Sequence, residues 1–179
     1  KLSFKADFIG IQNYTQEVIK HSWFKPYVQA DVVPSKKRAK PTSQMNWEII
    51  PEAIEKVFEQ LKQYPNLPDV YITECGVPLE NEERSGQKVY DMGRVNYYEK
   101  YLQCVESSIQ QGLPIKGLFF WTLHDNFEWA NGYTPKFGLL KIDRRTQKRT
   151  LKHSATWIRD MIKELKDEPV IKKERQGIK

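Results

Sequence analysis

The run Val70-Tyr71-Ile72-Thr73 decides the fold, because it is a short apolar segment without the polar alternation of a half-exposed strand. Two runs of the same kind occur elsewhere in the chain, Phe8-Ile9-Gly10-Ile11 and residues 115–123. Such apolar strands are typical of a parallel sheet whose two faces are covered by helices. The three runs therefore predict a parallel sheet buried on both faces.

Amphipathic helices are predicted between and after these strands. Residues 51–64 and 94–111 place apolar side chains at helical spacing, and Ser154 is expected to cap a third helix. The apolar face of that third helix consists of Trp157, Ile158, Met161, Ile162 and Leu165. Strands that alternate with helices indicate the α/β class.

The connecting segments are less regular. Residues 137–143 predict an additional short strand that leads into a basic turn, whereas residues 31–43 and 79–87 are polar and predict loops. Three strands are few for a doubly wound sheet, and a barrel needs eight strands in about 250 residues. The chain is therefore either a small open sheet or one segment of a larger fold, and its first residues resemble a linker within a protein more than a natural start.

Composition excludes several classes of protein. The 179 residues are 39% hydrophobic and include 22 aromatic side chains, which is too apolar for a disordered chain. The two cysteines, Cys75 and Cys104, cannot form a disulfide framework. The sequence contains neither an apolar run of about 18 residues nor an apolar signal segment at its start. We therefore expect no membrane partner and a cytoplasmic location.

The net charge of +6 is concentrated near the C-terminus. Residues 1–143 carry 17 Lys and Arg against 18 Asp and Glu, whereas residues 144–179 carry 12 against 5. Such a charge run is more often a solvated face than a binding surface, so nucleic-acid binding is disfavoured. The expected organisation is one body over residues 1–166, followed by a basic tail over residues 167–179.

Polar side chains follow each of the three predicted strands. Residues 12–15 contain amides and a phenol, residues 73–76 contain a carboxylate, and residues 121–129 (WTLHDNFEW) contain carboxylates and two indoles. Because the carboxyl ends of parallel strands meet at one edge of a sheet, these groups should converge there. Carboxylates beside indoles predict a carbohydrate site. For each residue taken singly, a solvated loop carboxylate or rim packing stays open as the alternative.

Other kinds of site have weaker support. His124 beside Asp125 is the arrangement of a base and its orienting partner, but no Ser or Cys nucleophile accompanies them in a matching motif. The three histidines and two cysteines lack metal-ligand spacing, and no glycine-rich phosphate loop occurs. We therefore expect no metal and no cofactor.

The segments at residues 71–76 (YITECG) and 121–129 resemble glycoside hydrolase family 1, the β-glucosidase family, whose motifs read I-T-E-N-G and W-S-L-x-D-N-F-E-W. Further matches, in the order in which the family has them, lie at residues 7–10 and 13–15, at 45–49, and at 132–133, 137–139 and 146–152. The resemblance implies an α/β fold that is the C-terminal part, strands 6–8, of a (β/α)8 TIM barrel. It also implies a retaining β-glycosidase that acts on terminal β-linked sugars.

The resemblance assigns roles to six residues. Glu74 would be the nucleophile that forms a glycosyl-enzyme, and the hydroxyl of Tyr14 would orient it. The expected substrate-binding residues are Trp121 beneath the sugar, Glu128 and Trp129 on sugar hydroxyls, and Phe137 near the primary hydroxymethyl. Three residues depart from the family pattern, namely Gln12, Cys75 and His124, and they leave the sugar preference open.

A retaining mechanism needs a second carboxyl group, which the family carries in an N-E-P motif. No Asn-Glu-Pro occurs in these residues. We therefore expect an N-terminal portion of the barrel, in the same or a second chain, to supply that group, and we expect this segment alone to be inactive. The alternative is a catalytically inactive protein that retains sugar or receptor recognition. Glu at position 128 favours unphosphorylated sugars, because 6-phospho members of the family carry a Ser and Lys set near this position.

Overall fold

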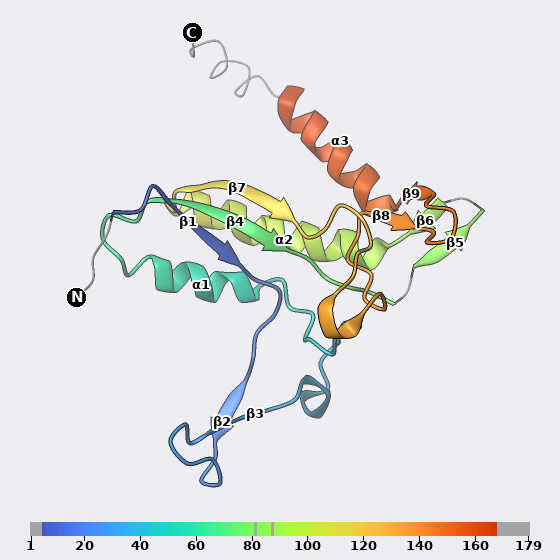
Figure 1. Cartoon of the computed structure of the whole chain (residues 1–179). Coiled ribbons are helices and arrows are strands. Elements are labelled where there is room, and N and C mark those ends of the chain that lie inside the picture. Colours follow the sequence, from blue (N-terminus) through green and yellow to red (C-terminus); the bar gives the residue numbers. More distant parts are fainter. Residues whose placement is uncertain (1–4, 81, 87, 168–179) are drawn as a thin grey trace.

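A three-stranded parallel sheet forms the centre of the computed structural model, which describes residues 5–80, 82–86 and 88–167 (Figure 1). The strand order is β1 (Phe8–Gln12), β4 (Asp69–Cys75) and β7 (Ile115–Phe120), so the strand with the decisive run is central. The three apolar runs thus form the predicted parallel sheet. The third strand is shorter than expected and ends at Phe120 rather than at residue 123.

Three helices accompany the sheet. They are α1 (Ala53–Leu61), α2 (Met92–Gln110) and α3 (His153–Asp167), each within a few residues of the predicted segment. Side chains of α1 and α2, including Ile54, Phe58 and Tyr98, pack on Val70 and Ile72 of the central strand and form the core. One face of the sheet is therefore covered by helices, as its apolar residues require.

The opposite face of the sheet differs from the prediction of burial on both faces. Phe8 of β1 is 56% exposed and Phe119 of β7 is 59% exposed. In the described ranges, both strands pair only with β4, so each presents one unpaired edge. The physical reason is that no element in this part of the chain packs against that face.

The third helix begins differently from the expectation. It starts at His153, so Ser154 lies in its first turn rather than at the capping position. The N–H of Ser154 donates to Oδ1 of Asp91 across 2.8 Å, and its hydroxyl donates to Oδ2 of the same carboxylate across 2.6 Å. A carboxylate just before α2 therefore satisfies the free donors at the start of α3.

Three short antiparallel hairpins complete the fold. They are β2 (Ile19–His21) with β3 (Ala30–Val32), β5 (Glu83–Ser85) with β6 (Lys88–Tyr90), and β8 (Leu140–Ile142) with β9 (Arg149–Leu151). The strand predicted at residues 137–143 is the shorter β8. The predicted loops contain β3, the 3-10 helix η1 (Ser35–Arg38) and β5. Figure 1 shows the β2–β3 hairpin projecting away from the sheet.

Two further sequence predictions concern membrane-spanning helices and a basic C-terminal tail. No helix in the described ranges has the length and apolar character needed to cross a bilayer. Helix α3 extends to Asp167, and the rest of the predicted basic tail lies outside the described residues. The division into a body and a tail therefore stays a prediction.

Candidate active site

The end of β4 is held from both neighbouring strands. The carbonyl of Glu74 accepts a hydrogen bond from the N–H of Asn13 across 3.3 Å, and the carbonyl of Cys75 accepts one from the N–H of Trp121 across 2.8 Å. Gly76 follows, and a Cβ atom there would lie 2.2 Å from the carbonyl oxygen of Trp121. The backbone around Glu74 is therefore fixed by contacts on both sides.

Tyr14 lies directly against the Glu74 carboxylate. Its hydroxyl donates to Oε2 of Glu74 across 2.6 Å. Burial raises the pKa of the Tyr14 phenol above its ordinary range, and the hydrogen bond to Glu74 and the charges of Glu74 and Glu128 raise it further. The phenol therefore stays protonated and acts as a donor to Glu74, which is the contact that the family resemblance implies for these two residues.

Trp121 and Glu128 form a second pair on the segment after β7. The indole Nε1 of Trp121 donates to Oε1 of Glu128 across 2.9 Å. Glu128 is buried, and its own N–H donates to the carbonyl of Gly132 across 2.6 Å. A buried carboxylate held in this way is an oriented hydrogen-bond acceptor, as a sugar-binding role requires.

An aromatic cluster supports Tyr14. The ring of Phe137 lies edge-on to Tyr14 at 5.9 Å between centroids, and the ring of Trp47 lies 5.6 Å from Tyr14 and 6.2 Å from Phe137. Phe137 is only 1% exposed, so its ring packs behind Tyr14 rather than at an open surface of the described residues. Trp47 lies in the segment at residues 45–49 that resembles a family motif, but no role was predicted for it. That motif is the feature of the sequence from which its place in the site could have been inferred.

Trp129 is placed apart from this cluster. Its side chain is 85% exposed, and none of the aromatic pairs found among the described residues includes its ring. The structure therefore brings together Tyr14, Glu74 and Phe137, and separately Trp121 and Glu128, with Tyr14 close enough for the Glu128 charge to raise its pKa.

The three departures from the family pattern lie in different environments. Cys75 is fully buried with its Sγ 3.8 Å from the carbonyl of Phe119, and burial raises the pKa of its thiol. Successive side chains of a strand point to opposite faces, so Cys75 is turned away from the Glu74 carboxylate. Gln12 is exposed, and His124 is half-buried.

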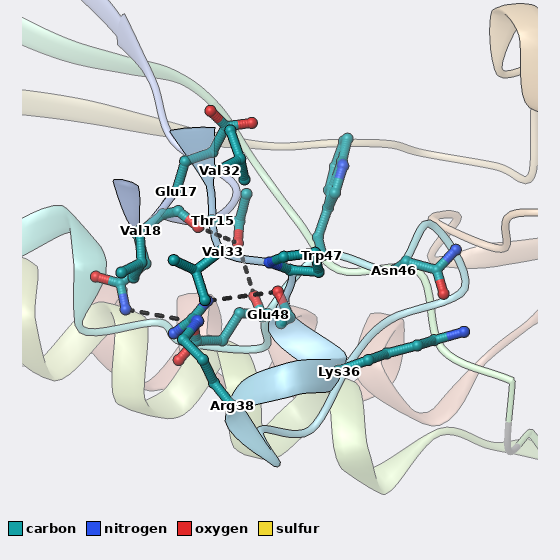
Figure 2. Close-up of a pocket in the computed structure, with 13 residues that line it drawn as sticks. Thr15, Glu17, Val18, Val32, Val33, Lys36, Arg38, Asn46, Trp47 and Glu48 are labelled. Atoms are coloured by element: carbon teal, nitrogen blue, oxygen red, sulfur yellow. Dashed lines mark hydrogen bonds and ion pairs between the residues drawn. The ribbon is translucent and has the colours of Figure 1, made fainter. Parts of the chain in front are cut away.

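A pocket adjoins the cluster within the long connection between β1 and α1. It is lined by residues 15–18, 32–36, 38 and 46–48, and Figure 2 shows Arg38 and Glu48 on its wall. The guanidinium of Arg38 pairs with the buried Glu48 carboxylate across 2.6 Å, and the Thr15 hydroxyl donates to the Glu48 carbonyl across 2.9 Å. These bonds connect the pocket wall to Tyr14 and Trp47, which are the sequence neighbours of Thr15 and Glu48.

The chemical capacity of the site follows from its groups. An oriented carboxylate, Glu74, is a potential nucleophile, and a second carboxylate, Glu128, with two indoles nearby in sequence suits a polyhydroxylated ligand. Over residues 5–80, 82–86 and 88–167, no group of three or more His, Cys, Asp or Glu side chains is arranged to hold a metal ion.

Comparison with known proteins gives a consistent result. Residues 1–167 match the family described as Glycosyl hydrolase family 1. Beta-glucosidase A of Thermotoga maritima is 38% identical over 159 residues, which are 89% of this chain and 35% of that protein. The 6-phospho-beta-galactosidase 1 of Streptococcus pneumoniae is 36% identical over 129 residues, which are 70% of this chain and 27% of that protein.

A solved structure agrees with these relatives. The Thermotoga maritima family 1 glycoside hydrolase, complexed with a cyclophellitol analogue that mimics the transition state, superposes with a TM-score of 0.82 at 36% identity. The superposition covers 89% of this chain and 35% of that one, so the chain spans about a third of the length of the relatives it matches. The prediction of a partial (β/α)8 barrel is confirmed, and the chain belongs to glycosyl hydrolase family 1.

Proposed function

We propose that this chain is the nucleophile-bearing part of a retaining β-glycosidase. The observation that carries the proposal is the 2.6 Å hydrogen bond from the Tyr14 hydroxyl to Oε2 of Glu74. A donor at this distance fixes the direction of the carboxylate, which is a property that a carboxylate nucleophile needs.

The reaction follows the two-step scheme of retaining enzymes. An oxygen of Glu74 bonds to the anomeric carbon of the sugar while the bond to the leaving oxygen breaks, and a second carboxylic acid protonates that oxygen. Water then attacks the same carbon, gives its proton to the second carboxylate and releases Glu74. The second carboxyl group lies in a portion of the barrel outside this chain.

The sugar would lie against Trp121 and Glu128, with the exposed Trp129 at its rim, whereas the buried Phe137 would support the site from behind Tyr14. The fixed carboxylate of Glu128 suits sugar hydroxyls and repels a phosphate group, so the proposed substrate is an unphosphorylated β-glycoside. The relatives include both a β-glucosidase and a 6-phospho-β-galactosidase, so a direct comparison of the two kinds of substrate tests this preference.

An N-terminal portion with the other five strands would complete the barrel. The proposal is supported by the exposed Phe8 and Phe119 and by the single pairing of β1 and of β7 in the described ranges. It is also supported by an apolar groove at α3, which is lined by residues that include Leu123, Leu151 and Ile162. Exposed apolar surface of this kind requires a partner, because it is costly to leave in water.

The test uses this chain joined to its own upstream coding sequence, so that the whole barrel is present. The protein is incubated with a 2-deoxy-2-fluoro-β-glucoside that carries a good leaving group, and the labelled peptide is identified by mass spectrometry. We expect the fluorosugar on the peptide that contains Glu74, and we expect Glu74→Gln to remove the label.

Two outcomes would reject the proposal. A label on another residue would move the nucleophile elsewhere. A folded barrel that binds the fluoroglucoside but forms no covalent adduct would favour the inactive, sugar-binding alternative. Arg159→Gln at an exposed ion pair with Asp160 is the matched control and should label as the parent does.

A further inference from the structure

We propose that Arg94 is a positioning residue for the Glu74 carboxylate, because it clamps the segment that holds Phe137 behind the Tyr14 phenol. Arg94 does not touch the Glu74 carboxylate and is not assigned a role by the family motifs considered above. The expected effect of Arg94 on catalysis rests on the proposed function, whereas its expected effect on the protonation of Glu74 does not.

Arg94 forms hydrogen bonds with the backbone on both sides of Phe137. The side chain is fully buried at the start of α2, and its guanidinium donates to the carbonyls of Lys136 and of Gly138, the latter across 3.2 Å. Its Nε also donates to the carbonyl of Val77 across 3.4 Å, three residues after Glu74. One guanidinium therefore joins the segment that carries Phe137 to the segment that carries the nucleophile.

A second buried pair holds the same segment from the other side. Oδ1 of Asp125 accepts from the N–H of Gly138 across 3.0 Å and from Nζ of Lys152 across 2.8 Å. A Cβ atom on Gly138 would lie 2.1 Å from the backbone nitrogen of Asp125. Phe137 is thus fixed by Arg94 at both flanking carbonyls and by Asp125 at the next N–H.

The position of Phe137 affects Glu74 through one ring contact and one hydrogen bond. Phe137 lies edge-on to Tyr14 at 5.9 Å, and a Cβ atom on Gly76 would lie 3.4 Å from Cδ1 of Phe137. Tyr14 in turn donates to Glu74 across 2.6 Å. Movement of Phe137 would remove one of the two rings that support Tyr14, the other being Trp47, so the hydrogen bond to Glu74 would lengthen or be populated less.

The charges around Arg94 make a purely stabilising role a poor explanation. Arg94 also pairs with Asp91 and with Glu82, and Lys152 pairs with Glu82 and Asp125. Burying so many charges costs desolvation free energy, and apolar residues of similar volume often stabilise a fold as well or better. What the ionic arrangement adds is direction, because the planar guanidinium fixes several backbone carbonyls in one geometry.

The experiment measures the protonation midpoint of the Glu74 carboxyl in the completed barrel. Glutamate is labelled with 13C at the carboxyl carbon, and the Glu74 signal is identified by its loss in Glu74→Gln. Tyr14, from the connection after β1, donates to Glu74, and Glu128, from the segment after β7, is close enough to Tyr14 for its charge to raise the pKa of that phenol. The variants are Tyr14→Phe, Phe137→Leu and Arg94→Lys, with Arg159→Gln as the matched control.

We expect Tyr14→Phe to move the midpoint to higher pH, since the ionised form loses its donor. Phe137→Leu and Arg94→Lys should move it in the same direction by at least half as much. Adding Arg94→Lys to Tyr14→Phe should cause no further shift, because both act through the same bond. The acidic limb of the kcat/KM profile should follow. A solely structural role for Arg94 would lower the amount of folded protein without moving the midpoint.

The inference is overturned if Arg94→Lys and Phe137→Leu keep the parent midpoint while Tyr14→Phe shifts it. It is also overturned if Tyr14→Phe causes no shift, because the last link would then be absent. Should Arg94→Lys fail to fold, Phe137→Leu tests the same series of contacts from Phe137 through Tyr14 to Glu74. Failure of the proposed function is seen separately, as absence of the fluorosugar on Glu74 in a parent protein whose midpoint still responds to the variants.

Discussion

The indole Nε1 of Trp121 and Oε1 of Glu128 lie 2.9 Å apart in a hydrogen bond between two residues of one nine-residue segment. Because the Glu128 side chain is only 7% exposed, this donor and the surrounding backbone determine where the carboxylate points. The pair therefore presents an acceptor in a fixed direction, close enough to Tyr14 for the Glu128 charge to raise the pKa of that phenol.

Glu128→Gln should weaken glycoside binding while leaving the fold intact. The amide oxygen still accepts from Trp121, but the charge is lost, and a hydrogen bond to a charged group contributes about 1.5–3 kcal/mol. We expect kcat/KM of the completed barrel to fall about 10- to 100-fold. Glu128→Leu should in addition lower the free energy of unfolding, because the Trp121 N–H loses its acceptor. Full activity of Glu128→Gln would contradict the assigned role.

Gly76→Ala should disrupt the end of β4. The added Cβ would lie 2.2 Å from the carbonyl oxygen of Trp121. The two backbone segments cannot move apart without breaking the hydrogen bond from the Trp121 N–H to the Cys75 carbonyl. We expect a loss of at least about 3 kcal/mol in the free energy of unfolding, measured with urea. The matched control is Gly86→Ala, where no atom lies within 4 Å and only the positive φ of 60° is unfavourable. That change should cost about 1 kcal/mol, and equal costs for the two variants would refute the clash.

Three buried tyrosines and the half-buried Tyr14 predict a steep loss of stability at alkaline pH. Burial raises the pKa of the phenols of Tyr14, Tyr97, Tyr98 and Tyr101 in the folded protein. Below the ordinary tyrosine pKa of about 10 both states keep these protons, so the phenols add no pH dependence. Above it the unfolded chain loses them and the folded chain does not, so each phenol lowers the free energy of unfolding by about 1.4 kcal/mol per pH unit.

Urea unfolding at a series of alkaline pH values, together with phenolate absorbance, measures this effect. Tyr101→Phe should reduce the slope by one proton and serves as the matched variant. Phenolate absorbance from all tyrosines before the protein unfolds would be inconsistent with burial of these four side chains.

Arg38→Met should loosen the connection between β1 and α1 without affecting the sheet. The buried Glu48 carboxylate would lose its ion partner and keep only the 3.4 Å contact from Gln16. We expect amide hydrogen exchange to accelerate about 10- to 100-fold over residues 15–48, corresponding to about 1–3 kcal/mol of local stability. Exchange in β4 should be unchanged. Lys25→Gln removes an exposed pair with Asp31 in the same region and should leave all rates as they are.

The sequence predicted the sheet well because its signal is local. Each strand contains a short run rich in apolar residues, and the run at residues 70–73 lies in the central strand. The short hairpins were missed, since three-residue strands have too few positions for alternation to be read. The start of α3 was wrong for a different reason, because the carboxylate that binds Ser154 is Asp91, 63 positions earlier.

The site was predicted unevenly. Convergence of polar residues at the strand ends followed from topology, but the pairing of Tyr14 with Glu74 came only from the family resemblance. Arg94 gave no signal, because a charged residue in an amphipathic helix is read as solvated, whereas its side chain is fully buried. Burial of such charges depends on partners far along the chain. The cytoplasmic location stays a prediction.

The hairpin formed by β2 and β3 begins and ends at the wall of the pocket, where Arg38 forms an ion pair with Glu48. Its sequence can therefore change while the strands and the nucleophile keep their geometry. Residues 19–32 could therefore be exchanged among relatives as one segment, provided that Arg38 and Glu48 are retained to anchor it.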